Sequence, residues 1–369
     1  MPPGIVRIGF VPLVDCALLV VAQEKGFFRR HSLEVELRKA QSWGQVQDKL
    51  LSREWDAAHC LITMPLQFAI AEPSGEPPVG YAFTLSRNGN GITLSNRLWN
   101  DGVRDATGLS AWLAAHPDRI LKLGVVFPRG TQEYFLRSWL AGGGLVLGPR
   151  IALTIIPPQE MVGRLRKGEI DGFCAGEPWS RRASASKLGR LVADSAGSLP
   201  GLGEKVLGVR SDWHRGHSLD HSRLIRALAQ ASLWMDDPAN LPEAVEIIAS
   251  KHYVNTPKTV VEAALRDAAG SPAAEAAASA IPKNAKEEIR FLGRTPNLPA
   301  KAHAQWYLDQ MRQWGHLDVT VADRLDLTAM CMEGFHLSVT ASLSSFVGQN
   351  LTHGAITPFP ARGNRGITP

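Results

Sequence analysis

The sequence has 369 residues, 44% of them hydrophobic, which suits either two domains of ordinary size or one large α/β unit. Its 40 Lys and Arg residues exceed its 35 Asp and Glu residues, but the basic residues are scattered, so we expect no direct binding of nucleic acid. No apolar run reaches the ~20 residues that a membrane-spanning helix needs, and we therefore expect no membrane segment.

The first residues and the cysteines both favour a cytoplasmic location. Residues 5–10 (IVRIGF) already form a predicted core strand, and no basic segment, apolar segment or cleavage site of a secretory signal precedes them. The four cysteines, Cys16, Cys60, Cys174 and Cys331, are widely spaced and form no Cys-x-x-Cys pair. We expect buried, reduced thiols in a reducing compartment.

The first third of the chain alternates predicted strands and helices. The alternation is expected to place strands at 5–11, 33–37, 56–61 and 79–85, and helices at 17–25, 43–51 and 65–71. Gly26 is positioned to cap the end of the first helix. This pattern predicts βαβ units with right-handed crossovers in a mostly parallel sheet.

A second run of the same kind begins near residue 120. The pattern predicts strands at 121–126, 151–156 and 170–175, and helices at 131–140 and 157–167. Thr131 is the expected N-cap of the first of these helices. Two βα lobes in one chain predict a ligand cleft between them, lined by the turns that follow the carboxyl ends of the strands.

Beyond Val206 the pattern becomes helical. The apolar periodicity predicts helices at 220–235, 241–249, 256–269, 284–292 and 300–314. From Gly334 onward the chain is rich in Ser, Thr, Gly and Pro. We expect this tail to be extended or poorly ordered.

Motifs of catalysis and cofactor binding are absent from the sequence. There is no Walker A motif, no GxSxG, no HExxH and no GxGxxG after a strand. His214, His217 and His221 lie close together but lack a carboxylate or Cys partner at ligand spacing, which favours a solvated helix face over a metal site. We therefore expect a protein that is not an enzyme and that has no cofactor and no bound metal.

Several long motifs, in the right order, carry a resemblance to a known family. The motifs are at residues 8–15 (IGFVPLVD), 22–28 (AQEKGFF), 157–162 (PPQEMV), 168–179 (GEIDGFCAGEPW) and 204–209 (EKVLGV). From residue 5 to about 235 the chain resembles the nitrate/bicarbonate-binding family of ABC-transporter receptors and its cytoplasmic relatives. We interpret Glu177-Pro178-Trp179 within the fourth motif as architectural, with Pro178 fixing the turn after a strand.

The resemblance implies an α/β fold of the type II periplasmic-binding-protein kind, with two α/β lobes joined by a two-segment hinge. Lobe one is expected to comprise 1–88 with 208–369, and lobe two 89–207. The hinge segments are expected near 85–94 and 202–209. The ligand is then expected in the cleft between the lobes.

The resemblance also implies a set of ligand-binding residues. Family receptors hold nitrate with a Trp, a Gln, a His and a Lys, and these positions fall on Trp43, Asn90, Gln132 and Lys205, so the second and third depart from the pattern. Nitrate is a planar anion with acceptors only, which suits one ammonium, two amides and an indole N–H. The N-terminus of the helix at Thr131 adds backbone donors and a favourable dipole. In bicarbonate-binding members the Lys205 position is acidic and works with calcium, so a lysine here implies an anion without metal.

Each of these residues also has a purely structural interpretation. Trp43 could pack in the core, and Asn90 could serve the conformation of a Gly-rich turn. Gln132 could be an exposed residue of a first helical turn. Lys205 could form a solvated ion pair with Glu204.

Without a visible signal, the chain looks like the cytoplasmic nitrate/nitrite sensors of the NasS type. In that system the ligand-free sensor holds an RNA-binding antiterminator of the NasT (ANTAR) type inactive, and nitrate or nitrite releases it. One alternative is the substrate-binding protein of a nitrate-type ABC transporter. Another is an enzyme of the pyrimidine-precursor synthesis type, which shares the fold but needs a catalytic His and Cys set that we do not find.

Overall fold

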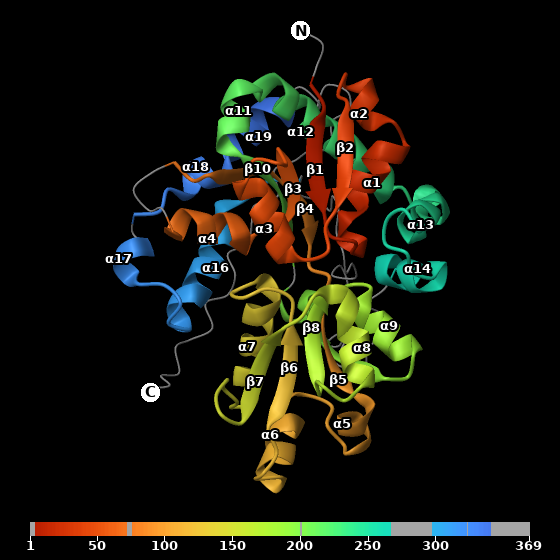
Figure 1. Cartoon of the computed structure of the whole chain (residues 1–369), viewed down its shortest axis with the longest axis vertical. Coiled ribbons are helices and arrows are strands. Elements are labelled where there is room, and N and C mark those ends of the chain that lie inside the picture. Colours follow the sequence, from red (N-terminus) through yellow and green to blue (C-terminus); the bar gives the residue numbers. More distant parts are fainter. Residues whose placement is uncertain (1–3, 72–75, 200, 267–296, 323, 341–369) are drawn as a thin grey trace.

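The computed structural model describes residues 4–71, 76–199, 201–266, 297–322 and 324–340 and shows two α/β lobes, one above the other in Figure 1. The first lobe contains a sheet in the order β2-β1-β3-β10-β4, and the second a sheet in the order β7-β6-β8-β5-β9. The strands are β1 (Val6–Phe10), β2 (Val35–Lys39), β3 (Ala57–Leu61), β4 (Val79–Arg87), β5 (Asn90–Ser95), β6 (Leu121–Val125), β7 (Ile151–Ile155), β8 (Gly172–Gly176), β9 (Gly189–Asp194) and β10 (Gly203–Arg210). The predicted two-lobed α/β fold is confirmed.

Each sheet contains one strand that runs against its neighbours. Strand β10 is antiparallel to β3 and β4, and β5 is antiparallel to β8 and β9, whereas β1 pairs in parallel with β2 and β3. Both reversed strands directly follow the passage of the chain from one lobe to the other, so each enters its sheet from the opposite end. The sheets are therefore mixed, and the prediction of mostly parallel sheets needs this correction.

The chain crosses between the lobes in two short segments. Only Asn88 and Gly89, with φ of 58° and 92°, separate β4 from β5, and this left-handed turn sends the chain straight into the second lobe. The return passes through β10, which pairs with the first sheet from Gly203 onward. We therefore propose residue 203, rather than 208, as the point where the chain re-enters lobe one.

Helices cover both sheets and form most of the described residues beyond β10 (Figure 1). They are α1 (Ala17–Glu24), α2 (Phe27–Arg30), α3 (Trp43–Leu51), α4 (Thr63–Ala71), α5 (Asn96–Asn100), α6 (Ala106–Ala115), α7 (Thr131–Gly142), α8 (Met161–Arg166), α9 (Trp179–Ala185), α10 (Ser195–Ser198), α11 (Ser211–Gly216), α12 (Ser218–Asp236), α13 (Leu241–Ala249), α14 (Lys258–Arg266), α16 (Lys301–Gln313), α17 (Val319–Ala322), α18 (Leu327–Cys331) and α19 (Glu333–Thr340). Within the described residues, no helix combines the length and apolarity needed to cross a membrane.

The local predictions hold in most places and fail in a few. Gly26 has a φ of 69° after α1, as expected of a residue that ends a helix, and α3 and α13 have the predicted bounds. The N-cap of α7 is Gly130 and not Thr131, which is the first helical residue. Several elements were not predicted, namely strands β5, β9 and β10 and helices α2, α5, α6, α9, α10, α11, α17 and α18. The helix predicted at 284–292 lies outside the described residues.

The predicted tail begins with a helix. Residues 333–340 form α19, and Val339 on this helix joins the buried apolar cluster of the first lobe. The apolar residues of this segment therefore outweigh its polar composition, and the prediction of an extended tail is wrong up to residue 340. The rest of the predicted tail lies outside the described residues.

Four of the described histidines, His59, His221, His303 and His336, are buried, and so are all four cysteines. His221 is fully buried with its Nδ1 2.9 Å from Nδ1 of His214, and its ring packs against Phe335 of α19, so the solvated face predicted for this histidine is wrong. Burial lowers the pKa of His221 to about 3, which keeps the ring uncharged at neutral pH. All four cysteines are buried free thiols, as predicted.

The two lobes share one buried apolar cluster. Leu13, Trp43 and Leu61 of the first lobe belong to the same cluster as Tyr134 and Phe173 of the second lobe. Burying apolar surface between the lobes stabilises their contact by roughly 25 cal/mol per Å². The structure is therefore a closed arrangement of the two lobes.

Hydrogen bonds across the junction act with this apolar contact. The backbone N–H of Val14 donates to the carbonyl of Glu177 at 2.9 Å, and Nε2 of Gln159 donates to the carbonyl of Gln41 at 2.6 Å. Farther out, the Tyr134 hydroxyl lies 3.0 Å from Nδ1 of His316, so the segment after α16 also contacts α7. The contacts between the lobes thus involve several elements on each side.

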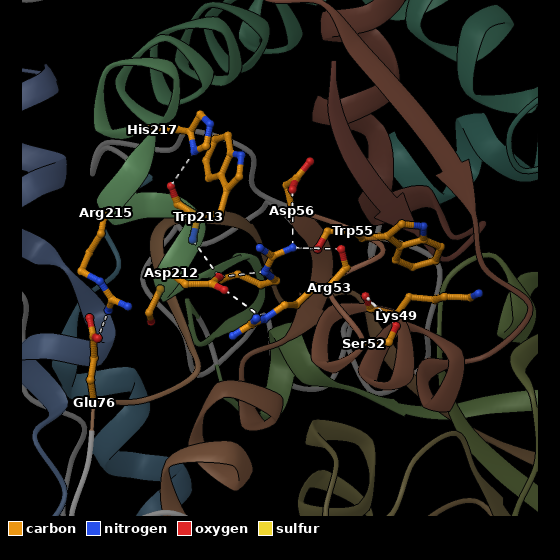
Figure 2. Close-up of polar contacts among 12 residues, drawn as sticks. Lys49, Ser52, Arg53, Trp55, Asp56, Glu76, Asp212, Trp213, Arg215 and His217 are labelled. Atoms are coloured by element: carbon orange, nitrogen blue, oxygen red, sulfur yellow. Dashed lines mark hydrogen bonds and ion pairs between the residues drawn. The ribbon is translucent and has the colours of Figure 1, made fainter. Parts of the chain in front are cut away.

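The far end of β10 is fixed by a group of charged residues (Figure 2). The Arg210 guanidinium donates to the carbonyls of Arg53 and Trp55 at 3.1 and 3.3 Å. It also pairs with Asp56 at 3.5 Å and with Asp212 at 2.9 Å. Figure 2 shows Asp212 reaching Arg53 as well, at 3.1 Å. These contacts hold β10 beside the start of β3 and so fix the register of the strand that re-enters lobe one.

The packing of β1 gives a first test of the fold. A Cβ atom on Gly9 would lie 2.0 Å from two ring carbons of Trp55, which is 4% exposed and has little room to move. Gly9→Ala should therefore lower the free energy of unfolding by about 2 kcal/mol, measured by urea denaturation. The matched control is Gly163→Ala in α8, where an added Cβ meets nothing within 4 Å, and this change should be neutral or stabilise by up to about 1 kcal/mol. Equal effects of the two substitutions would contradict the packing described for β1.

Candidate functional site

Polar side chains from both lobes meet in one buried group at their junction. None of them is more than 1% exposed, so in this closed arrangement none is in contact with bulk water. We call this group the interlobe cluster, and its members are Asp15, Trp43, His59, Asn90, Thr131, Gln132, Glu204 and Lys205. A completely buried group of this polarity is costly unless its members satisfy one another or a ligand.

Lys205 occupies the centre of the interlobe cluster. Its Nζ lies 3.0 Å from Oδ2 of Asp15 and 3.5 Å from Oε2 of Glu204. On the other side of Asp15, Oδ1 lies 3.1 Å from Nε2 of His59. The ammonium group is therefore held between two carboxylates, and the ion pair with Glu204 is buried rather than solvated.

The pKa values follow from these contacts. Burial by itself would raise the pKa of Asp15, but the charge of Lys205 and the neighbouring His59 outweigh it and bring the pKa down to about 2. Burial raises the pKa of Glu204, and Lys205 opposes this only in part. Burial would lower the pKa of Lys205, but the charges of Asp15 and Glu204 outweigh it and raise the pKa instead. The ammonium form of Lys205 is thus maintained in spite of complete burial.

A bulge in β10 explains how two neighbouring residues reach the same cluster. Successive side chains of a regular strand point to opposite faces, which would separate Glu204 from Lys205. The pairing of β10 with β4 shifts register between Gly203 and Lys205 and again between Lys205 and Val206. An extra residue in a strand turns a side chain toward a new direction, and bulges of this kind are common beside functional sites.

The second lobe supplies three side chains to the interlobe cluster. Asn90 begins β5, and its Nδ2 donates to the carboxylate of Glu204 and to the hydroxyl of Thr131, the latter at 3.3 Å. Nε2 of Gln132 donates to Oδ1 of Asn90 at 2.9 Å. Thr131 and Gln132 are the first two residues of α7, so the positive end of this helix points at the cluster.

Trp43 supplies a donor without an acceptor. It begins α3, which is capped by the side chain of Ser42, and the edge of its ring packs on His59 with centroids 5.2 Å apart. Its Nε1 is buried and has no hydrogen-bond partner among the described residues, and the same holds for Oε1 of Gln132. An unpaired buried N–H costs about 1–3 kcal/mol, so it is a ready donor for a ligand.

All five residues proposed from the sequence lie in the interlobe cluster. They are Trp43, Asn90, Thr131, Gln132 and Lys205. The core interpretation of Trp43 also applies, because its ring belongs to the shared apolar cluster while its N–H is unpaired. Gln132 is fully buried, so it is not an ordinary exposed residue of a first helical turn.

Three members of the cluster were not proposed from the sequence, namely Asp15, His59 and Glu204. A signal was present for two of them, because Asp15 and His59 each interrupt an otherwise apolar stretch, 13–18 (LVDCAL) and 57–62 (AAHCLI). A charged or titratable residue in a buried stretch is kept only with a partner. Glu204 had no such signal, because its orientation depends on the bulge in β10.

The charge balance of the interlobe cluster differs from a simple anion site. Two carboxylates against one ammonium leave a net charge of −1 when His59 is neutral. We had expected Lys205 to offer a free positive charge to the anion. In the structure, Asp15 and Glu204 already neutralise that charge. The described residues contain no group of three or more His, Cys, Asp or Glu side chains arranged to hold a metal ion.

Comparisons with known proteins identify the family of the chain and several of its relatives. The model of the NMT1-like family matches residues 1–249. The chain is 36% identical to the nitrate import ATP-binding protein NrtC of Synechocystis over 313 residues, which is 84% of this chain and 46% of NrtC. It is 31% identical to the nitrate/nitrite binding protein NrtA of Synechococcus elongatus over 323 residues, which is 85% of this chain and 72% of NrtA.

A solved structure agrees with these relatives. The crystal structure of the periplasmic nitrate-binding protein NrtA from Synechocystis matches with a TM-score of 0.82 at 25% identity, covering 95% of this chain and 93% of that protein. The chain spans about half the length of NrtC and of the bicarbonate transport ATP-binding protein CmpC, two of its more similar relatives. The chain therefore belongs to the NMT1-like family, and its homologues include nitrate- and bicarbonate-binding proteins.

Proposed function

We propose that the chain binds nitrate or nitrite in the interlobe cluster. The observation that carries the proposal is that buried hydrogen-bond donors from both lobes converge there, with the N–H of Trp43 unpaired. Relatives described as nitrate/nitrite binding proteins support this choice of anion. Nothing in the cluster resembles a nucleophile with its activating base, so we propose binding without catalysis.

The chemistry of the donors suits a small planar oxyanion. Nitrate has only acceptors, and Nε1 of Trp43 and Nζ of Lys205 are donors from the first lobe. The amides of Asn90 and Gln132 are donors from the second lobe, and both can turn from their present partners toward a ligand. The positive end of α7 adds a favourable dipole. We propose that the anion replaces Glu204, the more distant of the two carboxylates, beside Lys205.

Binding at this place couples the anion to the position of the lobes. Trp43 and Lys205 belong to the first sheet and its helices, whereas Asn90 and Gln132 belong to the second lobe. An anion that needs donors from both lobes binds better when the lobes are closed, and it shifts the population toward the closed state.

For the physiological role we propose a cytoplasmic sensor that sequesters an antiterminator of the NasT type when ligand-free and releases it when nitrate or nitrite binds. Four buried free thiols accord with a reducing compartment. A partner is released by linkage only if it prefers the open state of the lobes. A second candidate is the substrate-binding protein of a nitrate-type ABC transporter, which the description of NrtA as periplasmic favours.

The anion site is tested by isothermal titration calorimetry of the dialysed protein with nitrate. Trp43→Phe keeps the ring but removes the indole N–H, so it should weaken nitrate binding roughly 10-fold or more. Trp112→Phe is the matched control, because the Trp112 indole donates to Asp101 in the second lobe, outside the interlobe cluster. It should leave nitrate affinity unchanged. If the well-folded protein binds neither nitrate nor nitrite, the proposed function is wrong.

The physiological role is tested by mixing the protein with a NasT-type antiterminator and measuring the complex by size-exclusion chromatography. The sensor role predicts a complex without nitrate that dissociates when nitrate saturates the site, because closure removes the state that the partner prefers. Trp43→Phe should shift this dissociation to higher nitrate concentrations. If no complex forms, or if nitrate leaves it intact, the transport role becomes the better candidate.

A further inference from the structure

We propose that the interlobe cluster takes up one proton for each anion that it binds, and that Glu204 is the group that accepts it. This inference rests on the proposed function, since it concerns the same site and the same ligand. It arises from the charge balance of the cluster and from the complete burial of its members.

An additional anion cannot enter the cluster without compensation. With both carboxylates ionised and His59 neutral, the cluster has a net charge of −1, and a bound nitrate would bring it to −2. Each uncompensated charge in a buried site costs several kcal/mol. One proton per anion restores the original charge, so uptake of a proton is the simplest way for the site to accept nitrate.

The other groups that face the cluster offer no further positive charge. Cys174 of β8 and Tyr307 of α16 both lie within the electrostatic reach of Glu204, and burial raises the pKa of each so that both stay neutral. On the neighbouring elements of the second lobe the nearby acidic groups have partners of their own. These are Glu133, which pairs with Arg137 on α7, and Glu177, which pairs with Arg181 on α9. Among the described residues this leaves Lys205 as the cation of the cluster and His59 as the alternative proton acceptor.

The geometry favours Glu204 over Asp15 as the acceptor. Asp15 has close partners on both sides, His59 at 3.1 Å and Lys205 at 3.0 Å. Glu204 lies farther from Lys205, at 3.5 Å. Its other partners, the amide of Asn90 and the hydroxyl of Ser195, are neutral, so it is the carboxylate that an anion at Nζ would displace. Loss of the ammonium and the approach of an anion both favour the protonated form of a carboxyl group.

A protonated Glu204 would also change the hydrogen bonds of the cluster. The carboxyl group would become a donor, and its proton would be donated to the bound anion. Protonation would at the same time release Nδ2 of Asn90 from the carboxylate, so that this amide can donate to the anion. The same proton therefore balances the charge and frees a donor.

The direction of the pH dependence follows from linkage. Between the pKa of Glu204 in the free protein and its higher pKa in the nitrate complex, each anion brings in one proton, so nitrate affinity falls up to tenfold for each unit of rising pH. Below the pKa in the free protein the group is already protonated, so nitrate binding takes up no proton and its affinity stops changing. Burial raises this pKa above the ordinary range of a glutamate, which moves the transition toward neutral pH.

The test is nitrate calorimetry from about pH 6 to about pH 9 in pairs of buffers that differ in ionisation enthalpy. Nitrate does not titrate in this range, so any proton taken up belongs to the protein. We expect an uptake that rises with pH toward one proton per nitrate, together with the corresponding loss of affinity. In Glu204→Gln the uptake should vanish, and the affinity should become independent of pH while nitrate still binds. The matched control is His59→Gln, which should retain the uptake.

The outcomes separate the inference from the proposed function. Nitrate binding without proton uptake at any pH would overturn the inference and leave the anion site in place. Loss of the uptake in His59→Gln but not in Glu204→Gln would overturn the assignment to Glu204. The proton uptake measured with the wild-type protein shows whether nitrate binding is coupled to protonation, even if a variant fails to fold. Failure to bind nitrate at every pH would instead count against the proposed function.

Discussion

The buried ion pair between Lys205 and Asp15 is the interaction on which the rest of the site depends. An ammonium group without exposure to water must keep at least one charged partner, since removing such a partner costs about 3–5 kcal/mol. Asp15 follows β1, and Lys205 lies in β10, so the pair ties the start of the chain to the strand that returns from the second lobe. The order of the first sheet, with β10 between β3 and β4, brings these two side chains together.

This arrangement explains why the junction of the lobes is both polar and closed. The cluster is surrounded by an apolar contact that both lobes share, so its polar groups are satisfied by one another, by a few buried neighbours such as Ser195, or by a ligand. Opening the lobes would separate Asn90 and Gln132 from Glu204 and would expose Lys205. Closing of the lobes and formation of the hydrogen bonds of the cluster therefore occur together. A ligand that contacts both lobes shifts this equilibrium directly.

The sequence predicted the fold well because the signals for the fold are local. Periodicity placed α3 and α13 at their observed bounds, and the family motifs indicated two lobes and the residues that line their junction. The failures involve tertiary effects. The reversed strands come from the crossing between lobes, and the helix α19 comes from packing of Val339 on the first lobe. Neither can be read from a local pattern.

The predictions for the site divide in the same way into residues that the sequence identified and contacts that it did not. Trp43, Asn90, Thr131, Gln132 and Lys205 were placed by resemblance, but their partners were not. Glu204 reaches the cluster only because β10 bulges, and the neutralisation of Lys205 by two carboxylates depends on that bulge. The sequence could therefore identify the donors of the proposed anion site, whereas the charge balance of the cluster required the three-dimensional structure.

The most direct test of the account is a crystal structure of the protein grown with nitrate. The account predicts a planar anion between the lobes, within hydrogen-bond distance of Nε1 of Trp43 and Nζ of Lys205, with Glu204 moved away from the lysine. An anion bound elsewhere, or an unchanged set of contacts between Lys205 and both carboxylates in crystals saturated with nitrate, would contradict it.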